Sequence, residues 1–260
     1  MTRASTSRKQ LPRNPKRTAS KRGQQVDVEV MLVPTSERTS KARRNNDPIV
    51  PMNEAQRFYL AAMNEYVLTF ATGPAGTGKT WLCAAQAAKL LEEGAIDKII
   101  ITRPAMEAGE SLGFLPGEIE DKFDPYLQPF RDVLNERLGK TFTELLIKRG
   151  QVEAAPLAYM RGRTFKNAFV ILDEAQNTTP TQMKMFLTRI GEDCTVVVNG
   201  DMNQTDLRGE SGLEDAVARL AHLESVGHIH FRREDIVRSG LVQDVVECYE
   251  GPKPPRLHLG

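Results

Sequence analysis

An eight-residue segment, GPAGTGKT at residues 73–80, restricts the possible folds of this chain more than any other feature. It follows an apolar run at residues 66–71 and opens an amphipathic, helix-like stretch. The glycines allow the backbone to turn so that successive N–H groups point at phosphate oxygens, while Lys79 reaches the terminal phosphates and Thr80 holds Mg²⁺. The positive end of the following helix adds to this attraction. The order of strand, loop and helix predicts a nucleoside triphosphate site rather than a glycine-rich turn without a ligand.

Charge is distributed unevenly along the 260 residues, although the formal net charge is only +1. Residues 1–46 hold twelve Lys and Arg residues against three acidic ones, a net charge of +9 that leaves −8 on the remainder. This segment is also rich in Ser and Pro and poor in apolar residues, so burial cannot offset the entropy of ordering it. We expect a disordered basic tail, and three interpretations of it stay open: an arm that binds nucleic-acid phosphates, a solubilising leader or an organellar transit peptide.

The remaining sequence is long enough to form one core, with 40% apolar residues in the whole chain. We predict a single domain at residues 47–251 and an irregular C-terminal tail at residues 252–260, which contains three prolines. No apolar stretch is long enough to span a bilayer, so we expect no membrane association. The three cysteines are scattered, which argues against a disulfide framework or a zinc site and fits a reducing cytoplasm.

Short apolar runs alternate with longer amphipathic stretches through the predicted domain. This pattern is typical of an α/β fold with a mostly parallel sheet and helices on both faces. Predicted strands cover residues 66–71, 98–102, 151–155, 168–172, 195–199 and 228–231. Predicted helices cover residues 53–65, 79–93, 125–137, 142–148, 180–190, 213–220 and 240–249.

Polar side chains follow several of the predicted strands directly. In an open parallel sheet the ligand lies beyond the carboxyl ends of the strands, so residues at these positions are expected to converge in one crevice. Besides the glycine-rich loop, the residues expected there are Arg103, Asp173, Glu174, Asp201 and Gln204.

The run VILDEAQ at residues 170–176 supplies the second half of the predicted nucleotide site. An acid at the end of a buried strand can orient Mg²⁺, and the next acid can act on the attacking water. We therefore assign the magnesium role to Asp173 and the general-base role to Glu174. The alternative is that the two acids only cap a helix. Gln204 is expected to hydrogen-bond the γ-phosphate or the attacking water, although its surroundings are also good turn formers.

Together these motifs resemble the PhoH family, phosphate-starvation-inducible ATPases related to superfamily 1 helicases. The similarity covers about residues 49–250, nearly the whole predicted domain. The segments that carry it are the stretch around Gln56, GPAGTGKT at 73–80, ITRPAMEAGESLGFLPG at 101–117, APLAYMRGRTF at 155–165, VILDEAQNTTPTQMKMFLTRIG at 170–191, VVNGDMNQTDL at 197–207, SGL at 211–213 and FRREDIVRSGLV at 231–242.

The resemblance implies a single RecA-like P-loop NTPase domain that binds ATP and Mg²⁺. Gln56 would then read the adenine edge through its amide, although a glutamine on a helix surface is commonplace. The residues expected to bind the nucleotide are Gln56, Gly73, Pro74, Ala75, Gly76, Thr77, Gly78, Lys79, Thr80 and Trp81.

The resemblance also implies a nucleic-acid partner, with RNA favoured over DNA. A chain with one motor lobe would borrow the opposing surface from a neighbouring subunit, so a homo-oligomeric ring is expected, with a hexamer favoured. Arg238 looks like the arginine that stabilises charge on the transferring phosphoryl group; a surface ion pair with Glu234 or Asp235 is the alternative. Three further arginines would face nucleic acid or the phosphates: Arg103, Arg161 and Arg163.

The function expected from the sequence is Mg²⁺-dependent ATP hydrolysis coupled to nucleic-acid binding, remodelling or helicase-like translocation in a ring. The alternative is an ATP-gated assembly or scaffold protein that hydrolyses slowly and has no motor activity. A small-molecule kinase agrees less well with the sequence, because Asp173 and Glu174 together supply a base for water.

Overall fold

Six strands of the described chain form one parallel sheet. The computed structural model describes residues 45, 47–104, 119–207 and 209–237, with only the backbone for residues 119–126. The strands are β1 (Leu68–Thr72), β2 (Lys98–Arg103), β3 (Val152–Pro156), β4 (Ala168–Leu172), β5 (Cys194–Gly200) and β6 (Val226–His230). Their order across the sheet is β3-β2-β4-β5-β1-β6, and every neighbouring pair is parallel. The predicted α/β fold with a parallel sheet is therefore confirmed.

Strand register brings the carboxyl ends of the central strands to the same edge of the sheet. Thr72 at the end of β1 lies opposite Gly200 at the end of β5, and Leu172 at the end of β4 lies opposite Val198. Loops that leave these three strands consequently start side by side, although more than 100 residues of sequence separate the first from the last.

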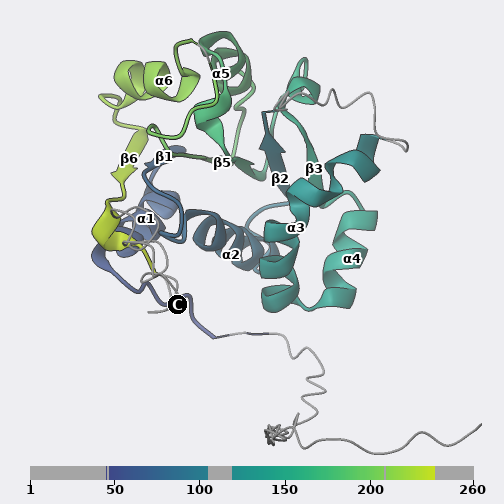
Figure 1. Ribbon diagram of the computed structural model, residues 1–260. Helices are drawn as coiled ribbons and strands as arrows, with labels where there is room; N and C mark the ends of the chain where they lie inside the picture. The colour runs from purple at the N-terminus through teal and green to yellow at the C-terminus, as the bar shows by residue number, and fades with distance from the viewer. Residues whose placement is uncertain (1–44, 46, 105–118, 208, 238–260) are drawn as a thin grey trace, which may run out of the picture. The chain divides into compact units, whose positions relative to one another are not determined.

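Helices cover both faces of this sheet (Figure 1). Four helices pack on one face: α1 (Glu54–Glu65), α2 (Lys79–Glu92), α3 (Ile119–Leu138) and α4 (Lys140–Lys148). The other face carries the 3₁₀ turn η2 (Leu157–Met160) and the helices α5 (Pro180–Leu187) and α6 (Gly212–Leu220). Along β4, Phe169 and Ile171 join the first core, while Val170 and Leu172 join the second. Burial of each such side chain contributes about 1.5–3 kcal/mol.

Most of the predicted elements are observed with small shifts at their ends. The predicted strand at 228–231 begins two residues earlier, at Val226, because Gly227 lets the backbone approach the ring of Tyr66; a Cβ there would lie 2.7 Å from Cδ2 of that ring. The predicted helix at 180–190 ends at Leu187, because the next residues turn to pair with Phe165. The predicted helix at 240–249 and both predicted tails, apart from residue 45, lie outside the described residues. Within the described ranges, no helix is both long and apolar enough to cross a bilayer.

A buried polar network lies behind the glycine-rich loop and joins three elements. The hydroxyl of Tyr59 on α1 donates to Oδ1 of Asn199 on β5 over 2.7 Å, and Nδ2 of Asn199 donates to Sγ of Cys83 on α2 over 3.3 Å. Burial raises the pKa of Tyr59 well above its usual value and that of Cys83 to about 12, so both groups are neutral at physiological pH. The network fixes the end of β5 against α1 and α2.

We expect Tyr59→Phe to lower the free energy of unfolding by about 1–3 kcal/mol, because Oδ1 of buried Asn199 loses its hydroxyl donor. Urea denaturation measures the change. Tyr159→Phe is the matched control: Tyr159 is 51% exposed, so the same deletion should change stability by less than about 0.5 kcal/mol. Equal effects of the two variants would contradict a stabilising role for this network.

Candidate functional site

The glycine-rich loop of residues 73–80, called the phosphate loop below, connects β1 to α2 and takes a shape that only glycine allows. Gly73, Gly76 and Gly78 have φ values of +134°, +82° and +85°. A Cβ on Gly73 would lie 2.2 Å from the carbonyl oxygen of Phe231, and one on Gly78 would lie 2.8 Å from Nε2 of Gln56. The loop backbone is thus wedged between the segment after β6 and helix α1.

Lys79 begins α2 and folds back over the phosphate loop. Its Nζ donates to the carbonyl oxygens of Gly73 (2.7 Å) and Pro74 (2.8 Å) and lies 3.2 Å from Oγ1 of Thr77. Burial lowers the pKa of Lys79, and nearby carboxylates, that of Asp201 foremost, counteract this shift. Lys79 therefore places a partly desolvated ammonium group at the mouth of the loop, where it suits an anion.

A cavity of about 300 Å³ lies directly above the phosphate loop. Its walls come from the ends of β1, β4 and β5, so the register of the sheet is what assembles it. The predicted site residues Lys79, Thr80, Asp173, Glu174 and Gln204 are brought together here. The complete wall consists of Gly73, Ala75, Gly76, Gly78, Lys79, Thr80, Trp81, Asp173, Glu174, Gly200, Asp201 and Gln204.

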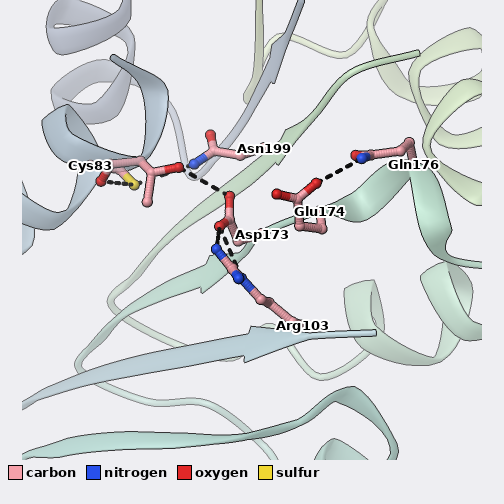
Figure 2. A network of polar contacts seen from close by, with 7 residues as sticks. Cys83, Arg103, Asp173, Glu174, Gln176 and Asn199 are labelled. Carbon is pink, nitrogen blue, oxygen red and sulfur yellow. Dashed lines mark hydrogen bonds and ion pairs between the residues drawn. The ribbon is translucent and has the colours of Figure 1, made fainter. Parts of the chain in front are cut away.

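Asp173 follows β4 and is only 3% exposed, so its charge needs partners (Figure 2). Oδ2 accepts hydrogen bonds from Nε (3.1 Å) and Nη2 (2.5 Å) of Arg103, and Oδ1 lies 3.4 Å from Oγ1 of Thr80. Burial raises the pKa of Asp173, and Arg103 opposes that rise. The Thr80 hydroxyl and the Asp173 carboxylate are hard oxygen ligands, which fits Mg²⁺ that also takes oxygens from phosphates and water.

Glu174 is held in an uncommon backbone conformation, with φ +55° and ψ +38°. It occupies the N-cap position of the short turn η3 (Ala175–Asn177), yet its side chain makes no capping hydrogen bond. Oε2 instead accepts a hydrogen bond from Nε2 of Gln176 over 2.7 Å (Figure 2). A left-handed non-glycine residue at the wall of a cavity is characteristic of functional sites. The helix-capping alternative does not describe this side chain.

Gln56 braces the phosphate loop in this structure. The residue is 4% exposed, its Nε2 donates to the carbonyl of Thr77 over 3.0 Å, and its Oε1 accepts from the amide of Met52 over 2.8 Å. Gln56 is therefore not the surface glutamine of the alternative interpretation. Adenine recognition by Gln56 stays a prediction.

The four predicted arginines lie in different places. Arg103 pairs with Asp173 at the cavity, Arg163 forms a bidentate ion pair with Glu153 on β3, and Arg161 is exposed on the turn after η2. Arg238 lies outside the described residues. The described chain ends one residue earlier, at Val237, whose amide donates to the carbonyl of Gly76 in the phosphate loop over 2.9 Å.

Two features of the site could not be assigned from the sequence. Gln176 belongs to the run that contains Asp173 and Glu174, but only its contacts show that it hydrogen-bonds Glu174. Tyr159 is 51% exposed on η2, whereas its neighbours Leu157 and Met160 are 1% and 0% exposed. An isolated aromatic residue in an apolar segment gives no sign of its exposure, so sequence alone does not identify it.

Arg103→Gln should destabilise the protein by about 3 kcal/mol at pH 8, because a buried carboxylate loses its counter-charge. Without Arg103 the pKa of Asp173 rises further, so folding favours the protonated form. The deficit relative to the wild type should therefore be smaller at pH 5 and grow as the pH rises through that pKa. Urea denaturation at the two pH values tests this. Arg103→Lys keeps the positive charge and should recover part of the stability; a deficit independent of pH would contradict the assignment.

Comparison with known proteins agrees with the motifs and the geometry of the site. The PhoH-like protein family model matches residues 48–250. Protein PhoH of Escherichia coli K12 is 55% identical over 79% of this chain and 59% of its own length, and a PhoH-like protein of Bacillus subtilis is 53% identical over 75% and 62%. The chain thus spans about 60% of the length of these relatives. The large terminase of a thermophilic bacteriophage aligns with a TM-score of 0.47 and 10% identity over 78% of this chain and 52% of that chain, which is too distant to bear on function. By its family match and its close relatives, the chain belongs to the PhoH-like protein family.

Proposed function

We propose that this chain binds ATP with Mg²⁺ and hydrolyses it, and that nucleic acid, with RNA favoured over DNA, is coupled to the reaction. The observation that carries the proposal is the convergence of Lys79, Thr80, Asp173, Glu174 and Gln204 on one cavity above a phosphate loop. A cation, a hydroxyl beside a buried carboxylate, and a second carboxylate are the groups that cleavage of a phosphoanhydride by water needs.

Each group has a distinct role in the proposed reaction. The loop N–H groups and Lys79 hold the β- and γ-phosphates, and Thr80 with Asp173 would hold Mg²⁺, which would neutralise phosphate charge. Glu174 accepts a proton from a water molecule as the water oxygen bonds to the γ-phosphorus and the bond to the ADP oxygen breaks. Gln204 at the opposite wall hydrogen-bonds the γ-phosphate or the water, and so distinguishes ATP from ADP.

The turn at η2 supports the nucleic-acid part of the proposal. Tyr159 is half exposed, and buried Leu157 and Met160 on either side anchor the turn that presents it. Arg161 is exposed two residues further on, while Arg163 is engaged by Glu153. An aromatic ring on which a base can stack, next to an exposed cation for a phosphate, is a common way to bind single strands.

A homo-oligomeric ring, with a hexamer favoured, completes the proposed function. A single P-loop domain supplies one wall of a nucleotide site, and a neighbouring subunit would supply the other in a closed, head-to-tail assembly. The contact between Val237 and Gly76 supports a role for the next residue, Arg238, close to the phosphate loop. In the proposal Arg238 stabilises charge on the transferring phosphoryl group, in its own subunit or in the next one.

Glu174→Gln should lower the rate of ATP hydrolysis by at least about 100-fold, because the amide cannot accept the proton from water. The Kd for ATP should stay within about threefold, since the phosphate loop is unchanged. Phosphate release and fluorescent-nucleotide titration measure the two quantities. Glu192→Gln, at a side chain that is 84% exposed, is the control and should hydrolyse ATP like the wild type. No ATP hydrolysis by the wild type, with or without RNA and DNA, would rule out the proposed function.

Tyr159→Ala should weaken binding of single-stranded RNA by about 5- to 100-fold through the loss of base stacking. Arg161→Ala should weaken it and lower the slope of log K against log salt by about 0.7, because one phosphate contact is lost. Fluorescence anisotropy over a series of salt concentrations measures both. Arg57→Ala, on α1 beside the opposite edge strand β6, is the control and should leave affinity unchanged. Wild-type affinity in both test variants would exclude η2 from the RNA contact, and comparison with single-stranded DNA tests the preference for RNA.

A further inference from the structure

Gln176 lies behind the wall of the phosphate-loop cavity and is 3% exposed. It sits in the turn η3, two residues after Glu174, and its side chain points back toward that residue (Figure 2). A buried carboxamide needs partners for its N–H groups and its oxygen, and the partners of Gln176 indicate what it does.

The two ends of this carboxamide bind different parts of the site. Nε2 donates to Oε2 of Glu174 over 2.7 Å, and Oε1 accepts from the backbone amide of Asp201 over 3.1 Å. The orientation of the amide is determined by these partners, because a flipped amide would oppose its oxygen to a carboxylate and its N–H groups to another N–H. Gln176 therefore bridges the proposed general base and the start of residues 201–207, called the β5 loop below.

The backbone of Gln176 reinforces this bridge. Its carbonyl oxygen accepts hydrogen bonds from the hydroxyls of Thr205 (3.2 Å) and Ser211 (3.0 Å). Gly200, at the end of β5, leaves room for the side chain: a Cβ there would lie 2.8 Å from Oε1 of Gln176. The β5 loop, which carries Gln204, is thus anchored at both its start and its end on the residue that holds Glu174.

We propose that Gln176 is the positioning residue for hydrolysis, because it fixes the carboxylate of Glu174 and links its position to the β5 loop. The inference rests on the proposed function, since it concerns the proposed base and the proposed γ-phosphate sensor of the same site. A shift of the β5 loop, on arrival or loss of the γ-phosphate at Gln204, moves the Asp201 amide and with it the carboxamide that holds Glu174. Gln176 acts through Glu174 and does not itself line the cavity.

Gln176→Glu separates the two halves of the bridge. The carboxylate keeps an oxygen for the Asp201 amide but loses the donor to Glu174, and it places a like charge beside that residue. Turnover of ATP, kcat, should fall about 10- to 100-fold because the base is displaced, whereas KM for ATP should stay within about twofold because no cavity wall changes.

Asn177→Asp is the matched control. Asn177 is the next residue, is buried like Gln176, and accepts through Oδ1 from the amide of Asp206 in the same β5 loop over 3.0 Å. Its substitution is the same change from amide to acid and keeps the same kind of acceptor, but no hydrogen bond joins Asn177 to Glu174 through their side chains in the described part of the chain. This variant should retain kcat within about twofold.

The double variant E174Q/Q176E provides a readout that does not depend on turnover. It exchanges amide and carboxylate between the two positions, so a hydrogen bond can form in the reverse direction. Its melting temperature should rise above that of Q176E toward the wild-type value, while hydrolysis stays lost because the base is absent.

The outcomes separate the two levels of the argument. A wild type that hydrolyses ATP, with Q176E reduced in kcat and N177D unaffected, supports the positioning role. A wild type that hydrolyses ATP, with Q176E and N177D indistinguishable in kcat, would overturn the role of Gln176 and leave the proposed function intact. A wild type without hydrolysis would overturn the proposed function and the positioning role with it.

Discussion

The site depends on the burial of one carboxylate, that of Asp173, at the carboxyl end of the central strand β4. A charge at this depth requires close partners, because desolvation of an isolated carboxylate costs several kcal/mol. Arg103 reaches it from the end of β2 and Thr80 from the start of α2. The ends of β2 and β4 and the start of α2 are thereby brought to the same point, which is also where the phosphate loop ends. A single electrostatic requirement thus aligns the elements from which the cavity is built.

Two hydrogen-bond networks connect this point to the rest of the fold. Behind the phosphate loop, Tyr59, Asn199 and Cys83 join α1, β5 and α2 in the apolar core. On the other side, Gln176 joins Glu174 to the β5 loop. Since Asn199 and Asp201 flank Gly200, both networks meet at the end of β5. In low dielectric such fully paired groups restrict motion, so a change in the β5 loop is transmitted to Glu174 rather than dissipated.

Much of the fold was predictable because local pattern and tertiary structure agree. The strand at 168–172 is predicted with the observed ends, since five consecutive apolar residues are buried by helices on both faces. Predictions failed by a few residues where a tertiary contact overrides local preference. Gly227 reads as a turn but extends β6 against Tyr66, and residues 188–190 leave their helix to meet Phe165. Contacts of this kind involve partners from distant parts of the chain, which periodicity cannot reveal.

The sequence alone determined the kind of chemistry: GPAGTGKT, the acids 173 and 174 and their places after apolar runs indicate a phosphate-binding site at the edge of a parallel sheet. It could not determine which polar groups are paired. Arg103, Arg161 and Arg163 are alike in sequence, yet one neutralises Asp173, one is exposed and one is bound by Glu153. Gln56 and Gln176 are both buried, one against the phosphate loop and one against Glu174. Only the tertiary structure decided these roles, because burial and hydrogen-bond partners arise when the strand ends come together in space.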